Sequence, residues 1–305
     1  MPSKSVIIIA GPTGVGKTAV AIELARQFKT EIISADSRQC FKELKIGVAR
    51  PSAEELNTIK HHFIASHSIH EKVDAAVFEK YALEKLAVLF EKHDVVIMAG
   101  GTGLYIKTFC EGMDDIPDIP RELRNRIAQN YKDNGLSWLQ QEVEKKDPEF
   151  YKIAEIQNPQ RLMRALEIIE STGQSVLSFR KGNKVKRDFN IIKVALELSK
   201  ETLHQQINKR VDKMLEEGLI DEVTQLQQDK HLNALQTVGY SEIFAFLDNK
   251  ISLEEAAELI KKNTRHYAKR QMTWFKKDKE VEWLQPSDTK KIKEYVSSTL
   301  SQKSF

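Results

Sequence analysis

The sequence predicts an α/β fold: a P-loop parallel-sheet core with helices on both faces, a helical insertion domain and a basic C-terminal helix. Three observations support this. An apolar run at residues 6–10 leads into a glycine-rich loop and then into a helical pattern. Strand and helix patterns alternate from there to about residue 103. The pattern is then helical from residue 117 to about residue 179, before a strand pattern returns at residues 190–196.

The first element is a strand that runs straight into a phosphate-binding loop. Residues 6–10 are all apolar and include three Ile, which is typical of a buried parallel strand. Apolar residues at helical spacing follow from residue 19 to residue 28. Between them the spacing G-x-x-x-x-G-K-[ST] identifies a P-loop. The loop consists of Gly11, Pro12, Thr13, Gly14, Val15, Gly16, Lys17 and Thr18.

The parts of this loop suit an anion. Its glycines allow the backbone N–H groups to point inward, and the N-terminus of the following helix adds a partial positive charge. Lys17 supplies a full charge, and the Thr18 hydroxyl can ligate Mg²⁺. The alternative is a glycine-rich turn without a ligand. We expect the loop to bind a diphosphate or triphosphate.

The composition is that of a globular protein with a full-sized core. The 305 residues suit one large or two ordinary domains, and 41% of them are hydrophobic. Cys40 and Cys110 lie far apart and offer neither a disulfide framework nor metal-ligand spacing. No stretch resembles a signal sequence or a membrane span. The sequence therefore suggests a cytoplasmic protein that does not bind a membrane.

Positive charge is concentrated in two segments, although the net charge is only +3. Residues 261–277 contain seven Lys or Arg and no acid, and residues 180–187 form a second basic run. Such clustering suggests a polyanion as partner, and a solvated helix face is the alternative. Lys262, Arg265, His266 and Lys269 would share one basic face, flanked by Lys261 and Arg270. The core-facing side of the same helix would consist of Leu253, Ala256, Ile260, Tyr267 and Phe275.

Two further strands, at residues 31–35 and 94–99, flank a helix at residues 77–90. Ligands of parallel sheets gather at the carboxyl ends of the strands. Asp36, Gly100 and Thr102 follow these two strands, so we expect them on the same edge as the P-loop.

The pattern changes at residues 117–120, where two prolines interrupt it. A helical insertion at residues 117–187 would then divide an α/β core of residues 1–116 and 188–305. Turn signals lie at residues 133–135 and 158–159, and Gly173 should end a helix at residues 160–172. A capping box at residues 252–255 should start the C-terminal helix, which continues through Phe275.

The chemistry depends on which carboxylate faces the bound phosphate. A motor ATPase needs Asp or Glu after the strand at residues 95–98, but Ala99 and Gly100 stand there. No guanine-reading Asn-Lys-x-Asp motif is present. Asp36 is the best-placed carboxylate and is expected to act as a base. The alternative role is to bind a ligand of the magnesium ion rather than the ion itself, or to cap a helix.

Several blocks of the chain together resemble the tRNA dimethylallyltransferases (isopentenyl-tRNA transferases), and they cover nearly its whole length. They follow the P-loop in this order: residues 36–39 (Asp-Ser-Arg-Gln), 46–51, 61–63, 100–105, 159–167, 238–240 and 268–275 (Ala-Lys-Arg-Gln-Met-Thr-Trp-Phe). The chain lacks the Cys- and His-rich zinc extension of some eukaryotic relatives, so the bacterial-type architecture is expected. Ala65 departs from the family, which usually has Asp there.

The resemblance implies a reaction. A dimethylallyl group passes from dimethylallyl diphosphate to the exocyclic amine of the adenosine adjacent to the anticodon, in tRNAs reading codons that start with U, and diphosphate is released. Mg²⁺ is the implied cofactor, and the tRNA anticodon stem-loop and dimethylallyl diphosphate are the implied partners of a monomer. The implied catalytic residues are Asp36, Thr18, Lys17 and Arg210, the last of these placed on the diphosphate.

The resemblance also implies tRNA contacts, and the basic face adds three more. The expected tRNA-binding residues are Asp36, Ser37, Arg38, Gln39, Thr102, Arg124, Gln160, Arg161, Leu162, Met163, Arg164, Arg265, Lys269 and Arg270.

Two other functions share part of this pattern. A small-molecule or nucleoside kinase would share the P-loop and the carboxylate after the second strand, but it would not explain the insertion or the basic helix. A nucleotide-gated RNA-binding protein without chemistry would not need Asp36 beside the P-loop.

Overall fold

The computed structural model describes residues 4–303 except 115, 181 and 183. The chain divides into two compact units: unit 1 comprises residues 1–111 and 186–305, and unit 2 comprises residues 112–185. The insertion expected from the sequence, residues 117–187, differs from unit 2 by a few residues at each end.

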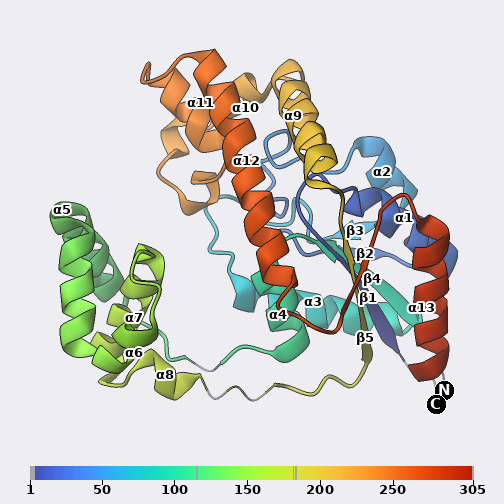
Figure 1. Ribbon diagram of the computed structural model, residues 1–305, viewed down its shortest axis with the longest axis horizontal. Helices are drawn as coiled ribbons and strands as arrows, with labels where there is room; N and C mark the ends of the chain where they lie inside the picture. The colour runs from blue at the N-terminus through green and yellow to red at the C-terminus, as the bar shows by residue number, and fades with distance from the viewer. Residues whose placement is uncertain (1–3, 115, 181, 183, 304–305) are drawn as a thin grey trace. The chain divides into compact units, whose positions relative to one another are not determined.

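Unit 1 contains a six-stranded parallel sheet with the order β3-β2-β4-β1-β5-β6 (Figure 1). β1 pairs with β4 on one side and with β5 on the other, so the strand that follows the insertion returns to the centre of the sheet. The strands are β1 (Ser5–Ala10), β2 (Ile32–Ser34), β3 (His61–His62), β4 (Val95–Gly100), β5 (Asn190–Leu196) and β6 (Val281–Leu284).

Both faces of the sheet are covered, which explains why β1 is continuously apolar. Val6 and Ile8 belong to one hydrophobic cluster, and Ile7 and Ile9 belong to another. Successive side chains of a strand point to opposite faces, so each cluster fills one side of the sheet. Helices α3 (Ala75–Phe90) and α4 (Gly103–Glu111) pack into the first cluster, and α1 (Lys17–Phe28) and α13 (Thr289–Lys303) into the second.

The remaining helices of unit 1 include the long α12 (Leu253–Phe275), which runs beside α9 (Lys200–Glu216) in Figure 1. Ser52 and Ser252 form capping boxes with Glu55 and Glu255, so the predicted start of the C-terminal basic helix is confirmed. The shorter helices are α2 (Ala53–Thr58), α10 (Leu219–Gln225), α11 (Tyr240–Leu247) and two 3₁₀ turns, Gln227–Asp229 and Asn233–Leu235.

Unit 2 is helical and has its own hydrophobic core, which includes Leu139, Phe150 and Leu166. Its helices are α5 (Arg121–Lys146), α6 (Pro148–Ile153), α7 (Pro159–Thr172) and α8 (Val176–Phe179). The turn expected at residues 133–135 is instead a kink within α5 at Gly135, where φ is 74°. Gly173 ends α7 in the left-handed conformation (φ 72°), as predicted.

The sequence patterns located the long buried strands, but several elements had no predicted counterpart, among them β3, β6 and α13. β3 has two residues and β6 has four, too few to show a periodicity. Among the described residues, no helix is both long and apolar enough to cross a membrane.

Candidate active site

The P-loop connects the end of β1 with the first turn of α1. Gly16, the residue before the helix, has φ 98°, a left-handed conformation that glycine adopts without steric cost. Lys17 Nζ donates to two carbonyls of the loop, Gly11 O at 3.0 Å and Pro12 O at 2.8 Å. Because these bonds hold the ammonium over the loop, a bound anion would meet Lys17 together with the backbone N–H groups.

Two cations converge on this loop. Burial lowers the pKa of Lys17 to about 8, while Asp36 raises it and Arg210 lowers it further. Arg210 projects from α9, and its Nη1 donates to Thr13 Oγ1 at 3.4 Å. Burial also lowers the pKa of Arg210, against the attraction of Asp36. Lys17 and Arg210 are thus partly desolvated charges that a diphosphate would compensate.

Asp36 lies just beyond β2 and is half-buried. Its Oδ1 accepts hydrogen bonds from Arg38 N at 2.9 Å and Gln39 N at 3.2 Å, which closes a turn. Its other oxygen, Oδ2, has no hydrogen-bond partner among the described residues. One oxygen therefore shapes the loop, and the other is available to a substrate.

Hydrogen bonds connect the loops that follow β2 and β4, which lie side by side because the two strands are neighbours in the sheet. Ser37 N donates to Thr102 Oγ1 at 3.0 Å, and Thr102 Oγ1 donates to Ser37 Oγ at 3.3 Å. Thr102 N also donates to Ala35 O at 3.2 Å. The structure thus brings Ser37 and Thr102, 65 residues apart, into one cluster next to Asp36.

α12 supplies side chains that sequence reasoning missed. Gln271 is 6% exposed and bonds both to the P-loop and to the turn after β4. Trp274 packs against Gly103, and any side chain at position 103 would collide with the Trp274 ring. The family resemblance could have identified both residues, because each belongs to the block at residues 268–275 that also contains the expected tRNA contacts Lys269 and Arg270.

Comparison with known proteins identifies the family of the chain. The family model of IPP transferase matches residues 39–278. A tRNA dimethylallyltransferase of Christiangramia forsetii is 48% identical and one of Cytophaga hutchinsonii 45% identical, each over 98% of this chain and 99% of the relative. The structure of a full-length tRNA isopentenylpyrophosphate transferase from Bacillus halodurans is 32% identical (TM-score 0.72; 99% of this chain, 98% of that chain).

The chain belongs to the tRNA dimethylallyltransferase family. It is accordingly a transferase that prenylates the adenosine at position 37 of tRNA. A eukaryotic dimethylallyltransferase described as acting on tRNA is also similar, with a TM-score of 0.74, 29% identity, and coverage of 89% of this chain and 70% of that chain.

Two of the tRNA-binding positions expected from the family are held by protein carbonyls. Arg38 Nη1 donates to Asn233 O at 3.1 Å and to Ala234 O at 3.3 Å. Gln39 Nε2 donates to Val48 O at 3.2 Å and to Ala49 O at 3.0 Å. These bonds fix the loop after Asp36, and RNA contact by Arg38 and Gln39 stays a prediction.

Glu222 organises the neighbouring family block at residues 46–51, and no motif or periodicity indicated this role. Its carboxylate accepts from the backbone N–H groups of residues 45, 46 and 47 at 2.7–3.0 Å. The hydroxyl of Tyr240, from the Val-Gly-Tyr block, donates to the same carboxylate at 2.6 Å. Since Gln39 bonds to Val48 and Ala49, Glu222 indirectly supports the loop of Asp36.

Ala65, where the family usually has Asp, has an unusual backbone conformation. Ala65 has φ 47°, in the left-handed region, where Asp and Asn are less strained than Ala. Its N–H donates to Gln39 O at 2.9 Å.

In unit 2, two expected tRNA contacts share one carboxylate. Arg164 Nη1 lies 3.1 Å from Glu167 Oε2, and Arg124 Nε lies 3.8 Å from the same oxygen. Gln160 and Arg161 are exposed, and Met163 is partly buried. Leu162 is fully buried in the unit's core, so its side chain cannot touch RNA in this fold.

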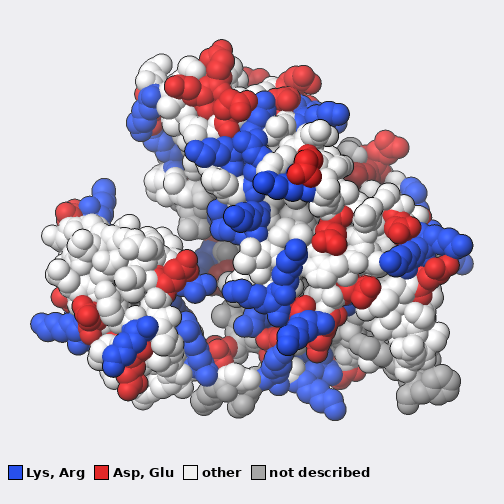
Figure 2. Space-filling view, viewed as in Figure 1, with Lys and Arg blue, Asp and Glu red and all other residues white. Residues whose placement is uncertain are grey.

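Fewer cations of α12 are exposed than the sequence suggested, although Lys and Arg cover much of this region in Figure 2. Lys261 Nζ pairs with Asp212 at 2.8 Å, and Arg265 Nη1 donates to Asn208 Oδ1 at 2.7 Å, so both reach towards α9. The exposed cations on the helix are Lys262, Lys269 and Arg270.

Tyr267 does not pack into the core as predicted, whereas Ala256, Ile260 and Phe275 do. It lies beside Thr102, and the guanidinium of Arg270 is 5.6 Å from the centroid of its ring. Burial raises the pKa of Tyr267 to about 12, Asp36 raises it as well, and a hydrogen bond to Thr102 opposes the shift. The apolar spacing could not reveal this, because a tyrosine suits a core and a polar site equally well.

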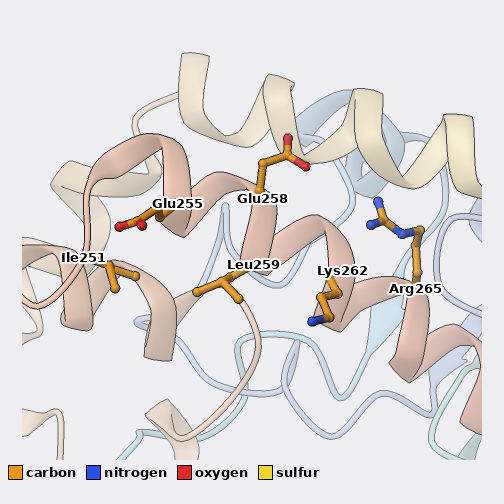
Figure 3. A pocket seen from close by; sticks show the side chains of 6 residues that line it. All are labelled: Ile251, Glu255, Glu258, Leu259, Lys262 and Arg265. Atoms are coloured by element: carbon orange, nitrogen blue, oxygen red, sulfur yellow. The ribbon is translucent and has the colours of Figure 1, made fainter.

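A cavity of about 370 Å³ lies along the N-terminal half of α12 (Figure 3). Of the expected site residues only Arg265 lines it, so the cavity is separate from the P-loop, where the chemistry is expected. Its lining residues are Ile251, Glu255, Glu258, Leu259, Lys262 and Arg265.

The second basic run is also partly engaged. Arg187 donates to Glu79 Oε1 at 2.5 Å and to Phe109 O at 2.8 Å. Arg180 lies 5.6 Å from the centroid of the Phe150 ring. Lys181 and Asn183 lie outside the described residues.

Proposed function

We propose that the P-loop holds the diphosphate of dimethylallyl diphosphate, between the N-terminus of α1, Lys17 and Arg210. The observation that carries this proposal is the meeting of the anion site and Asp36 at one edge of the sheet. Lys17 is close enough to Asp36 for the carboxylate to affect its pKa. A diphosphate at the loop would therefore lie near the base that the acceptor needs.

The proposed reaction is an alkyl transfer. The bond between the allylic carbon and the diphosphate oxygen breaks, and that carbon bonds to the exocyclic nitrogen of the adenine. The nitrogen loses a proton to Asp36 Oδ2, and diphosphate leaves with the electron pair of the broken bond. The backbone N–H groups, Lys17 and Arg210 stabilise the charge that develops on the leaving group.

The acceptor enters from the side of the loops after β2 and β4. An adenine must leave its base stack to reach Asp36, and proteins hold such bases between flat and polar side chains. Ser37, Thr102 and Tyr267 provide such groups near Asp36, and Trp274 adds a flat ring against Gly103, the residue after Thr102. We propose that the anticodon stem-loop also contacts Arg124, Arg161 and Arg164 of unit 2.

Mg²⁺ is the proposed cofactor, held by the Thr18 hydroxyl. Among the described residues, no group of three or more His, Cys, Asp or Glu could hold a metal ion alone. Mg²⁺ commonly keeps several waters and binds through one or two protein groups plus substrate phosphates, so one hydroxyl fits an ion that arrives with the diphosphate. When bound, it would neutralise charge on the leaving group. Because one chain supplies every residue named above, we propose a monomer as the catalytic unit.

Mass spectrometry of tRNA nucleosides after incubation with each candidate donor tests this function. Dimethylallyl diphosphate with Mg²⁺ should modify the adenosine, and ATP should be neither required nor hydrolysed. Thr18→Ala should lose activity and diphosphate affinity while remaining folded. Thr224→Ala is the matched control, because the Thr224 hydroxyl donates to Ile220 O in its own helix and to no other group among the described residues. If tRNA stimulated the release of phosphate from ATP, the result would favour a kinase or an ATPase instead.

A further inference from the structure

Gln271 bridges the two loops that hold the proposed substrates. Its Oε1 accepts from Thr13 N in the P-loop at 2.8 Å. Its Nε2 donates to Gly101 O, in the turn that leads to Thr102, at 2.8 Å. The side chain is 6% exposed, so water does not compete effectively for either bond.

Only a side-chain amide of this length meets both partners. Thr13 N–H can only donate and Gly101 O can only accept, which fixes the orientation of the amide. A carboxylate would not donate to Gly101, and an ammonium would not accept from Thr13. Gly101 allows the close approach, since a side chain there would collide with Gln271 Nε2.

The helix that carries Gln271 also faces the acceptor. Lys269 and Arg270 precede Gln271 and are exposed. Tyr267 lies beside Thr102, and Trp274 lies against Gly103. A shift of α12 on RNA binding would therefore move the amide that holds the P-loop.

We propose that Gln271 is a positioning residue that couples donor binding at the P-loop to tRNA binding on α12. The inference rests on the proposed function of the P-loop. RNA that fixes α12 also fixes the amide of Gln271, which holds the P-loop and the Thr102 turn in the arrangement that the reaction needs. Donor affinity then rises when tRNA is bound, and by linkage tRNA affinity rises equally with the donor.

The test measures the Kd of an unreactive thio analogue of dimethylallyl diphosphate, with and without saturating tRNA. In the natural protein the ratio of the two Kd values should be about 5- to 150-fold, the usual range for coupled sites. Gln271→Met keeps the shape but neither bond, and should bring the ratio within about twofold of 1. Gln271→Glu accepts from Thr13 but does not donate to Gly101 while ionised, and should also lower the ratio.

Asn263→Ala is the matched control for loss of stability. Asn263 is a half-buried amide on the same helix, and its Nδ2 donates to Glu242 Oε1 at 2.7 Å, away from both loops. Its loss should lower the Tm and leave the Kd ratio unchanged, so a fall in the ratio in both variants would indicate a merely structural role and overturn the proposal.

Three other results would also overturn it: a ratio near 1 in the natural protein, an unchanged ratio in Gln271→Met, or an unchanged ratio in Gln271→Glu. Failure of the proposed function gives a different result, namely no binding of the analogue by the natural protein with or without tRNA.

Discussion

Asp36→Asn separates the observed role of this residue in its loop from its proposed role as the base. Oδ1 accepts hydrogen bonds from Arg38 N and Gln39 N, and Oδ2 has no hydrogen-bond partner among the described residues. Asn keeps an oxygen for both backbone bonds but cannot take a proton. Asp36→Ala removes both bonds, which at about 0.5–1.5 kcal/mol each costs about 1–3 kcal/mol of stability. The Asn variant should therefore stay close to natural stability.

The catalytic effect of Asp36→Asn should be much larger than its effect on stability. General-base assistance is typically worth ~10²–10⁴-fold, or about 3–5 kcal/mol of activation free energy. The assay is the single-turnover rate at saturating donor and tRNA, with donor Kd and Tm measured alongside. The donor Kd should change less than the rate, because in the proposed complex the P-loop, Lys17 and Arg210 contact the diphosphate and Asp36 does not.

Asp74→Asn is the matched control for Asp36. Asp74 Oδ1 accepts from Ala76 N and Val77 N, both at 3.1 Å, so it makes the same kind of turn at the start of α3. This variant should leave the single-turnover rate unchanged. A near-normal rate for Asp36→Asn would refute the assignment, since Asp36 would then only shape its loop and another group would have to be the base.

Three further predictions follow from named contacts. Lys17 binds the anion only when it is protonated, and burial lowers its pKa to about 8. Donor affinity should therefore be steady at lower pH and fall above about pH 8. Lys17→Met should bind the donor weakly at every pH and should lack this inflection. Lys269→Ala should lower the salt slope of tRNA binding by about 1, and an unchanged slope would show a merely solvated side chain. Lys261→Ala, whose charge is paired with Asp212, is its control and should not alter the slope. Tyr240→Phe removes a hydrogen bond to the Glu222 carboxylate, and should lower the free energy of urea unfolding by about 1.5–3 kcal/mol; no change would mean that this bond does not stabilise the loop.

Local sequence determined the P-loop side of the candidate site. The P-loop is a contiguous segment whose spacing specifies a turn and a helix N-terminus, and the strand before it is apolar because both faces of the sheet are covered. The strand at residues 190–196 and the helix ends at Ser252 and Gly173 were predictable for the same reason, since period and capping residues lie within a few positions of one another.

Tertiary structure alone decided how the loops around Asp36 and Thr102 are held together. Gln271 contacts a loop 258 residues earlier in the chain, and Glu222 binds backbone N–H groups about 175 residues away. Neither pairing leaves a periodic signal, because it depends on where α12 and α10 pack and not on neighbours in the sequence. The same holds for Tyr267, whose spacing matches the core-facing residues of α12, yet the packing of that helix places it beside Thr102.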